Sequence, residues 1–235
     1  MALPLREIVP TGPPDGGSWW GRIPAVRQVL SEGWSLAPVT VLVGDNGAGK
    51  STLVEAVAAA YGMGPEGGSI GSGYSTRATE PGLELTVRRD VGAARSGFFL
   101  RAETMHAFYS FLEENPGARR EPRFHEMSHG ESFLSLIGDR MFRPGLYLLD
   151  EPESALSFDG CLALVAKVVD LVRNDSQVLL STHSPVLAAI PDAVVWEVGE
   201  WGLRRCDWED LDLVRRWRGF LDAPQRFLRH VVDVD

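Results

Sequence analysis

The segment GDNGAGKST at residues 44–52 restricts the fold of this chain more than any other stretch. It matches the pattern G-x-x-x-x-G-K-[ST], in which glycines let the backbone turn tightly and point successive N–H groups at a phosphate. A short β-branched run, residues 39–43, precedes the segment, and residues 51–61 follow it with apolar side chains at helical spacing. The segment therefore predicts a buried strand, a phosphate-binding loop and a helix whose positive dipole end faces the anion.

The polar residues at the end of this loop have separate expected roles. Lys50 should reach the β- and γ-phosphates, the Ser51 hydroxyl should bind Mg²⁺, and Thr52 should support the α-phosphate. Lys50 and Lys167 are the only lysines in a chain that otherwise uses arginine, which favours a compact ammonium at position 50. The alternative is a chance match in a glycine-rich turn, and the flanking strand and helix disfavour it. The remaining predicted nucleotide-binding residues are Gly44, Asp45, Asn46, Gly47, Ala48 and Gly49.

A second apolar run, residues 146–149, ends in the adjacent acids Asp150 and Glu151. Neighbouring residues of a strand point to opposite sides, so the two carboxylates should have different roles. Asp150 is expected to hold the magnesium ion, and Glu151 is expected to polarise the attacking water as a general base. An isolated pair of acids could simply cap the strand before Pro152, but this alternative weakens in a chain that also carries a phosphate loop.

Taken in order along residues 39–185, these motifs resemble those of the ABC ATPase superfamily. The resemblance is strongest to the RecF- and SMC-like branch, and within it to small stand-alone bacterial AAA-family ATPases that lack transport domains. The matching segments are GDNGAGKST (44–52, Walker A), SHGES (128–132, ABC signature), LLDEP (148–152, Walker B), ESALS (153–157, D-loop) and STHS (181–184, switch histidine).

The resemblance implies an ATPase that uses ATP and Mg²⁺ and acts as a homodimer formed on ATP binding. The signature residues Ser128, His129, Gly130 and Glu131 would begin a helix and face the γ-phosphate held by the other subunit. His183 would hydrogen-bond the γ-phosphate and the attacking water. Adenine is expected over guanine on the resemblance, since no N-K-x-D motif is visible. Apart from the place of His129 in the signature segment, the side chains of His106, His125 and His129 are expected to be structural.

Some positions depart from the family pattern or remain open. Glu131 replaces the usual glutamine of the signature, which is typical of the branch without transport domains. The magnesium-contacting Q-loop glutamine is not evident, and either Arg101 or Glu103 could take its place. Trp19 or Trp20 could stack on adenine, although tryptophan equally often fills a core.

The alternation of strands and helices predicts an α/β fold with a mainly parallel central sheet flanked by helices. The resemblance implies that this fold is a P-loop NTPase of the ABC ATPase-like kind. We expect one domain over 1–235, with an irregular lead-in (1–21), a small helical signature region (about 103–140) and C-terminal helices (208–235). A glycine-rich loop is expected at 63–79. The other expected strands are 83–89, 97–102, 177–180 and 193–198, and the other helices are 104–114, 128–137, 158–173, 209–221 and 223–231.

The composition of the chain limits the kinds of partner that it is expected to bind. The net charge of −9 and the pI of about 5.1 disfavour an autonomous nucleic-acid binder, although a local patch stays open. No apolar run approaches the ~18 residues of a membrane span, and no secretory signal is recognised. Cys161 and Cys206 have no neighbours at metal-ligand spacing. We therefore expect a cytoplasmic protein without direct membrane insertion. The C-terminal arginines could bind nucleic acid, but a solvated helix face paired with nearby acids is favoured; they are Arg215, Arg216, Arg218, Arg226 and Arg229.

Three uses of ATP are compatible with these motifs. The first is a stand-alone mechanochemical switch with a nucleic-acid or protein partner, tied to DNA repair or defence. Such a switch could not carry a long coiled-coil arm, because only residues 104–127 separate the candidate Q-loop from the signature segment. The second is the nucleotide-binding subunit of a transporter with a separate membrane protein. The third is a non-hydrolysing scaffold, which the intact Lys50, Asp150 and Glu151 disfavour.

Overall fold

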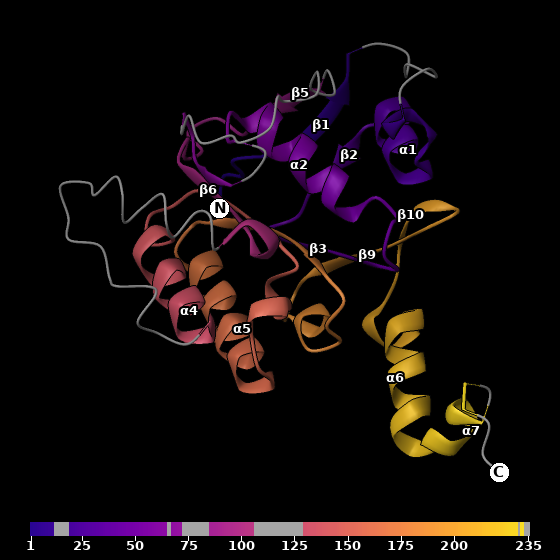
Figure 1. The fold of residues 1–235 in the computed structure, drawn as a ribbon. Helices are drawn as coiled ribbons and strands as arrows, with labels where there is room; N and C mark the ends of the chain where they lie inside the picture. The colour runs from indigo at the N-terminus through magenta and orange to yellow at the C-terminus, as the bar shows by residue number, and fades with distance from the viewer. Residues whose placement is uncertain (12–18, 65–66, 72–84, 106–128, 230, 233–235) are drawn as a thin grey trace.

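The computed structural model describes residues 1–11, 19–64, 67–71, 85–105, 129–229 and 231–232. Its centre is a seven-stranded sheet in which five neighbouring strands run parallel and the two edge strands are antiparallel (Figure 1). The order is β10 (Gly202–Arg205), β9 (Val194–Gly199), β3 (Val39–Gly44), β8 (Gln177–Thr182), β7 (Leu146–Asp150), β6 (Gly97–Arg101) and β4 (Gly68–Ser69).

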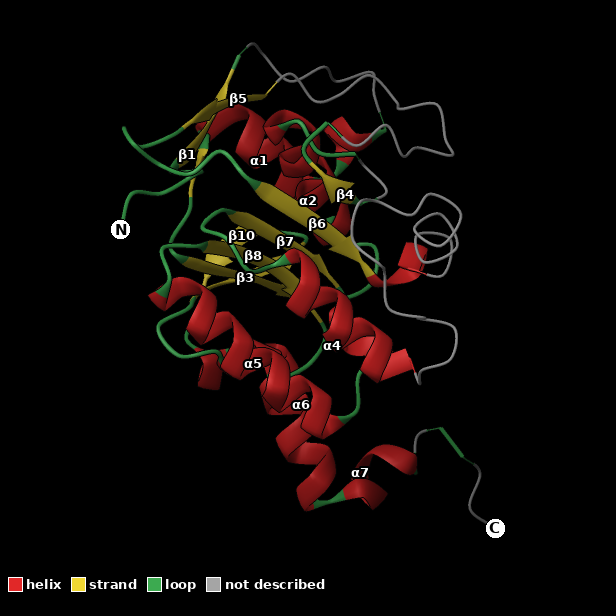
Figure 2. Ribbon diagram, turned by 90° about the vertical axis from the view of Figure 1, so that its left-hand side faces the viewer, coloured by secondary structure: helices red, strands yellow, loops and turns green. Residues whose placement is uncertain are grey.

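Helices cover both faces of this sheet (Figure 2). One face carries α4 (His129–Arg140) and α5 (Phe158–Arg173), and the other carries α1 (Pro24–Glu32) and α2 (Lys50–Tyr61). This layering confirms the predicted α/β fold with a mainly parallel sheet. A small antiparallel sheet lies on the α1–α2 side, in the order β2 (Trp34–Ser35), β1 (Glu7–Pro10) and β5 (Leu85–Arg88).

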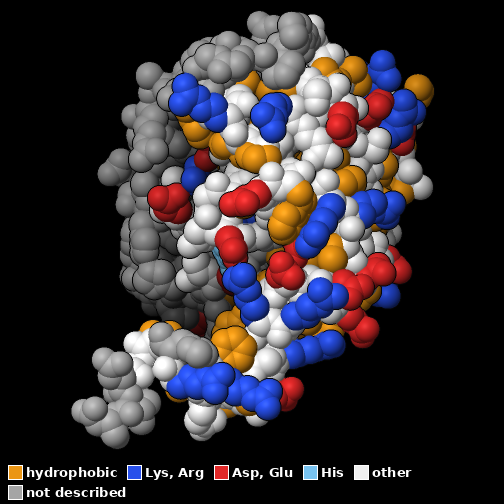
Figure 3. Space-filling model, turned by 90° about the vertical axis from the view of Figure 1, so that its right-hand side faces the viewer, with side chains coloured by type: hydrophobic (Ala, Val, Ile, Leu, Met, Phe, Trp, Pro, Cys, Tyr) orange, Lys and Arg blue, Asp and Glu red, His pale blue; other side chains and the backbone are white. Residues whose placement is uncertain are grey.

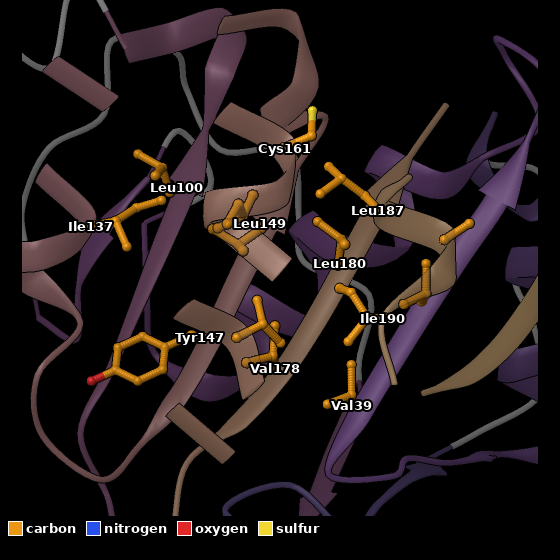
Figure 4. Close-up of a cluster of buried hydrophobic side chains, with 14 of the residues drawn as sticks. Val39, Leu100, Ile137, Tyr147, Leu149, Cys161, Val178, Leu180, Leu187 and Ile190 are labelled. Carbon is orange, nitrogen blue, oxygen red and sulfur yellow. The ribbon is translucent and has the colours of Figure 1, made fainter. Parts of the chain in front are cut away.

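The central strands are apolar along their whole length because both of their faces are covered. In β3, Val41 and Val43 pack with the helices α4 and α5, whereas Leu42 packs with α1 and α2. Strands β7 and β8 alternate in the same way. Figure 4 shows one of the two resulting cores, with side chains from the sheet and from both covering helices.

The sheet topology brings the functional motifs to one edge. Because β3, β6, β7 and β8 run parallel, their carboxyl ends lie side by side, and each end carries one of the predicted motifs. Asp150 on β7 pairs in register with Arg101 on β6 and with Ser181 on β8. The carboxyl edge of a parallel sheet is where α/β proteins usually bind ligands.

The N-terminal lead-in is not irregular throughout, which corrects the prediction for residues 1–21. Residues Glu7–Pro10 form β1, and both Leu5 and Ile8 are fully buried. The Gln177 side chain holds this segment by accepting from Leu5 N at 2.8 Å and donating to Leu5 O at 2.7 Å. A strand of four residues beside prolines is too short for its periodicity to be recognised.

Helix α1 was also not predicted, although its sequence carries a usable signal. Pro24 occupies the first turn, where its missing N–H costs nothing, and the buried residues follow at helical spacing. The buried side chains are Ala25, Val26, Val29 and Leu30.

Most other predicted elements are confirmed, with shifted ends. Helix α5 matches the predicted 158–173, and β7 extends one residue to Asp150. The predicted 209–221 helix divides into the 3₁₀ helix η6 (Trp208–Asp210) and α6 (Asp212–Asp222), and the last helix, α7 (Pro224–Leu228), is shorter than predicted. Residues 106–114 of the 104–114 helix, and most of the 63–79 loop, lie outside the described residues.

We predict that truncating the first strand destabilises the whole domain. Ile8→Ala should lower the free energy of unfolding by about 2–5 kcal/mol, because it leaves a cavity in a closed core. Denaturant titration would measure the change. The matched control is Ile70→Ala, at a position that is 39% exposed, where the loss should stay small. Equal losses in the two variants would contradict a structural role for the lead-in.

Candidate functional site

The loop between β3 and α2 wraps tightly around an open space. Gly47 and Gly49 have φ angles of 79° and 101°, which are strained for other residues. A Cβ atom on Gly49 would lie 2.4 Å from Ile23 Cγ2, whereas a Cβ on Gly47 would meet nothing within 4 Å. The loop is thus closed on one side by Ile23, which directly precedes α1, and open on the other, as a phosphate cradle requires.

Lys50 is the first residue of α2, and its side chain folds back under the loop. Nζ donates to Gly44 O at 2.9 Å and to Asp45 O at 3.1 Å. Burial lowers the pKa of Lys50, and the nearby carboxylates of Glu151, Asp150 and others oppose that shift. A buried ammonium that donates to carbonyl oxygens is suited to bind an anionic ligand. The charge of that ligand would compensate for the hydration that the ammonium loses on burial.

Asp150, at the end of β7, joins three elements of the site. Its Oδ1 accepts from Ser51 Oγ of α2 at 3.1 Å and from Ser181 Oγ of β8, and its Oδ2 lies 3.4 Å from Arg101 Nε of β6. Burial raises the pKa of Asp150, and the hydrogen bond from Ser181 and the charge of Arg101 act in the opposite direction. A carboxylate held this way is orientated before any ligand arrives.

The Ser51 and Asp150 oxygens fit the expected magnesium site. They lie in contact, and hydroxyl and carboxylate oxygens are the ligands that Mg²⁺ prefers. Among the described residues, no group of three or more His, Cys, Asp or Glu side chains could hold a metal ion. Magnesium usually takes one or two protein carboxylates and fills its other positions with phosphate and water, so Asp150 and Ser51 would be the residues that hold it.

Glu151 turns away from its neighbour. Its φ of 49° is in the left-handed region, which is uncommon for a residue with a side chain. Its Oε1 lies 3.2 Å from His183 Nε2, and its side chain is 39% exposed. The two adjacent acids therefore face different surroundings, and Glu151 is the one with access to water.

One nitrogen of His183 connects the phosphate loop with Glu151. His183 Nε2 lies 2.9 Å from Lys50 Nζ as well as 3.2 Å from Glu151 Oε1. The ammonium can only donate, so Nε2 faces it with a lone pair, whereas a hydrogen bond to the Glu151 carboxylate needs a proton on Nε2. The ring nitrogen can therefore satisfy only one of the two contacts at a time, and its tautomer determines which one.

Glu153 is a site residue for which the sequence indicated only a D-loop-like segment. Its Oε1 accepts a hydrogen bond from the backbone N–H of His183. Its Oε2 is buried and has no hydrogen-bond partner among the described residues. Glu153 thus fixes the backbone of the histidine segment from η4 (Pro152–Ala155). An acid directly after Glu151-Pro152 is the only sequence signal for this contact.

The signature segment is described only in part. Ser128 lies outside the described residues, as do His106, His125 and the side chain of His129. Helix α4 begins at His129, and a Cβ on Gly130 would lie 3.5 Å from Ala155 O of η4. Glu131 is exposed. The start of the signature helix therefore packs on the predicted D-loop, and its role toward a second subunit stays a prediction.

The structure distinguishes the two candidates for the Q-loop position. Arg101, at the end of β6, lies beside Asp150 and also pairs with Glu55. Glu103 is 78% exposed, and its carboxylate lies 3.1 Å from Arg101. Arg101 is therefore the residue in contact with the predicted magnesium ligand, and Glu103 reaches that ligand only through Arg101.

A cavity of about 730 Å³ opens beside the loop, on the β9 side. Its wall includes loop residues 44–48 and His183, and its volume is typical of a site for a nucleotide-sized ligand. Two tryptophans line it, Trp201 and Trp217. Trp19 and Trp20 do not line it; Trp19 is 56% exposed, and Trp20 packs against the core on the α1–α2 face. Figure 3 shows this side of the molecule, where arginines are interspersed with acidic and apolar side chains.

Comparisons with known proteins agree with the motifs. A family model described as "AAA domain, putative AbiEii toxin, Type IV TA system" matches residues 110–189. A Streptomyces avermitilis protein named "Putative ABC transporter ATP-binding protein" is 29% identical, with 72% of this chain and 33% of that protein covered. The zinc import ATP-binding protein ZnuC of Yersinia enterocolitica is 30% identical, with 67% and 65% covered. The chain thus spans about one third of the length of the Streptomyces protein and just under two thirds of the length of ZnuC.

Among solved structures, the SMC head domain from Thermotoga maritima overlaps 87% of this chain and all of that chain, with a TM-score of 0.48 and 14% identity. The sequence matches and the motif geometry, rather than this overlap, make the chain similar to ABC-type ATPases. Nucleotide binding is the property that this similarity implies. Within the described ranges, no helix has both the length and the apolar character needed to cross a membrane.

We predict that the buried charge of Asp150 costs stability at neutral pH. Burial raises the folded-state pKa of Asp150 above its unfolded-state pKa. The wild type therefore loses stability as the pH rises from the unfolded-state pKa through the folded-state pKa. Asparagine does not ionise, so the variant avoids that loss. Without ligands, Asp150→Asn should therefore melt higher than the wild type at pH 7, by about 2–4 °C for each kcal/mol relieved. Calorimetry should show the gap narrowing toward pH 4.

The control for this experiment is Asp139→Asn, at an exposed position of α4, which should change the melting temperature little at either pH. An Asp150→Asn protein that is less stable than the wild type at pH 7, with a deficit that disappears in acid, would show that Asp150 stabilises the fold as an anion and would contradict the prediction.

Proposed function

We propose that this chain binds ATP with magnesium in the 44–52 loop and hydrolyses it. The observation that carries the proposal is the cluster at the carboxyl edge of the sheet. There Ser51 donates to Asp150, and both Lys50 and Glu151 lie within hydrogen-bond distance of His183 Nε2. Cys161 and Cys206 are free thiols, and we place the activity in the cytoplasm, where thiols stay reduced.

In this proposal each residue keeps the role that its surroundings allow. Lys50 holds the terminal phosphates, and Ser51 and Asp150 supply oxygens to the metal site. Glu151 Oε1 accepts a proton from a water molecule, since it is the carboxylate with solvent access. His183 Nε2 senses whether Lys50 has moved toward a ligand, and Glu153 keeps the histidine backbone in place. Bound magnesium would supply neutralisation of phosphate charge.

Removing the loop ammonium should abolish tight nucleotide binding. Lys50→Ala is expected to raise the Kd for MgATP by about 10–100-fold or more, because a charge-assisted contact to phosphate is lost. Isothermal titration calorimetry would measure this. The matched control is Lys167→Ala, since Lys167 is the chain's other lysine and lies on α5, and it should bind normally. Unchanged affinity in Lys50→Ala would exclude the loop as the phosphate site.

We also propose that two copies enclose the nucleotides between them. The start of the signature helix α4 packs on the D-loop-like η4, so the two segments that the family resemblance assigns to the partner's nucleotide lie together. Glu131 is exposed there, and Glu151 is only partly covered. An exposed base gains the water exclusion that catalysis needs when a second copy covers it.

The sandwich can be trapped by neutralising the base. Glu151→Gln with MgATP should elute as a dimer in gel filtration and turn over about 10²–10⁴-fold more slowly, because proton abstraction is lost while binding remains. The control is Glu209→Gln, an exposed acid of η6, which should behave as the wild type. A Glu151→Gln protein that stays monomeric and hydrolyses ATP at the normal rate would contradict both the base and the dimer.

We propose that the chain is an ATP-driven switch that does not serve transport. Its partner in this role would be a nucleic acid or a protein. Arg215 pairs with Asp210 at the surface, as the solvated-face interpretation expects, so the C-terminal arginines do not by themselves favour nucleic acid. The second candidate is the nucleotide-binding subunit of a transporter, which the names of the relatives favour. Stimulation of the ATPase by DNA or RNA would support the first candidate, and co-purification with one membrane protein would support the second.

A further inference from the structure

The cavity beside the phosphate loop extends well past the residues that contact phosphate. From loop residues 44–48 it continues to the end of β9 and to α6, where Glu200, Trp201 and Trp217 form its wall. Arg22 and Arg216 also line it. Its far end is therefore aromatic, and its near end is the polar loop, which is the division of character that a nucleotide presents.

Helix α6 is anchored where it borders this cavity. Glu197 of β9 is 3% exposed; its Oε1 accepts from the backbone N–H of Asp212 at 2.8 Å, and its Oε2 accepts from Arg204. Leu211 and Val214 are buried in the core on the α4–α5 face. Trp217 lies three residues after Val214, so it continues the inward side of the helix beyond the point where the sheet edge ends.

The two tryptophans of the wall are not equivalent. Trp201 is held in place, because Arg204 lies over its ring at 3.9 Å from the centroid and because a Cβ on Gly199 would come within 2.6 Å of its ring. Trp217 is 47% exposed, and within the described part of the chain no aromatic or cationic side chain stacks on its ring. Trp217 is thus the side chain whose ring face is available to a ligand. Arg216, its neighbour, lies 3.8 Å from Asp45 of the loop and links α6 to the cradle.

We propose that α6 supplies the base-binding wall of the nucleotide site, and that a purine base stacks on Trp217 while its phosphates lie in the 44–52 loop. This rests on the proposed function and adds a residue to the site from the C-terminal helix, far from the phosphate motifs in sequence. Stacking on an aromatic side chain accepts any π-face, so it strengthens binding of the nucleoside without reading its edge.

The test separates the base from the phosphates. MgADP and inorganic pyrophosphate share a diphosphate, only MgADP carries a base, and neither can be hydrolysed to phosphate by the proposed ATPase step. Trp217→Ala should weaken MgADP by about tenfold in calorimetry, within the range for loss of one stacked base, and leave pyrophosphate unchanged. Trp217→Phe should retain most of the affinity for MgADP, because it keeps a ring.

Leu221→Ala is the matched control, since Leu221 lies on the same helix and is 70% exposed, and it should bind both ligands normally. Equal MgADP affinity in Trp217→Ala and the wild type would overturn the inference, as would equal weakening of MgADP and pyrophosphate. The proposed function has its own separate outcome: a wild type that binds neither ligand overturns it, and the base wall with it.

Photolabelling would locate the bound base independently of the affinity measurements. Wild-type protein irradiated with 8-azidoadenosine triphosphate should carry the label on the peptide that contains α6. A label confined to the peptide that contains Trp19 and Trp20 would overturn the inference and would instead favour the stacking residues expected from the sequence.

Discussion

The buried carboxylate of Asp150 is the interaction on which the rest of the site depends. It lies at the end of β7 and is contacted by Ser51 of α2, Ser181 of β8 and Arg101 of β6, so one charged group joins four elements of the fold. Only 3% of its surface is exposed, and a buried charge persists only where partners compensate it. The sheet order is what places these partners around one side chain.

Around this carboxylate, the site is divided into a buried half and an accessible half. Lys50 and Asp150 are buried. Burial lowers the pKa of Lys50 and raises the pKa of Asp150, so it favours the neutral form of both side chains. Glu151 and His183 are partly exposed and face each other. The buried half suits ligand binding, because fixed charges are strong in a dry environment. The accessible half suits proton transfer, because water can reach it.

Several parts of this arrangement could be predicted, and others could not. The loop at 44–52, the strand ending in Asp150 and the helix over 158–173 were predicted because each is coded by a local pattern of glycine, apolar or acidic residues. Strand β1 was missed because four residues carry too little periodicity, and because the segment that leads into it is held by Gln177, which lies 172 residues further along the chain. Helix α1 was missed although Pro24 and its apolar spacing were visible.

By itself, the sequence determined the phosphate loop, the acids at the end of β7 and the resemblance to ABC-type ATPases, because these depend on residues that are adjacent in the chain. Only the tertiary structure decided which tryptophans border the cavity, that Arg101 rather than Glu103 reaches Asp150, and that Glu153 holds the backbone of His183. The physical reason is that such contacts arise from the order of strands in the sheet and from the packing of helices on it. Neither is encoded by the spacing of neighbouring residues.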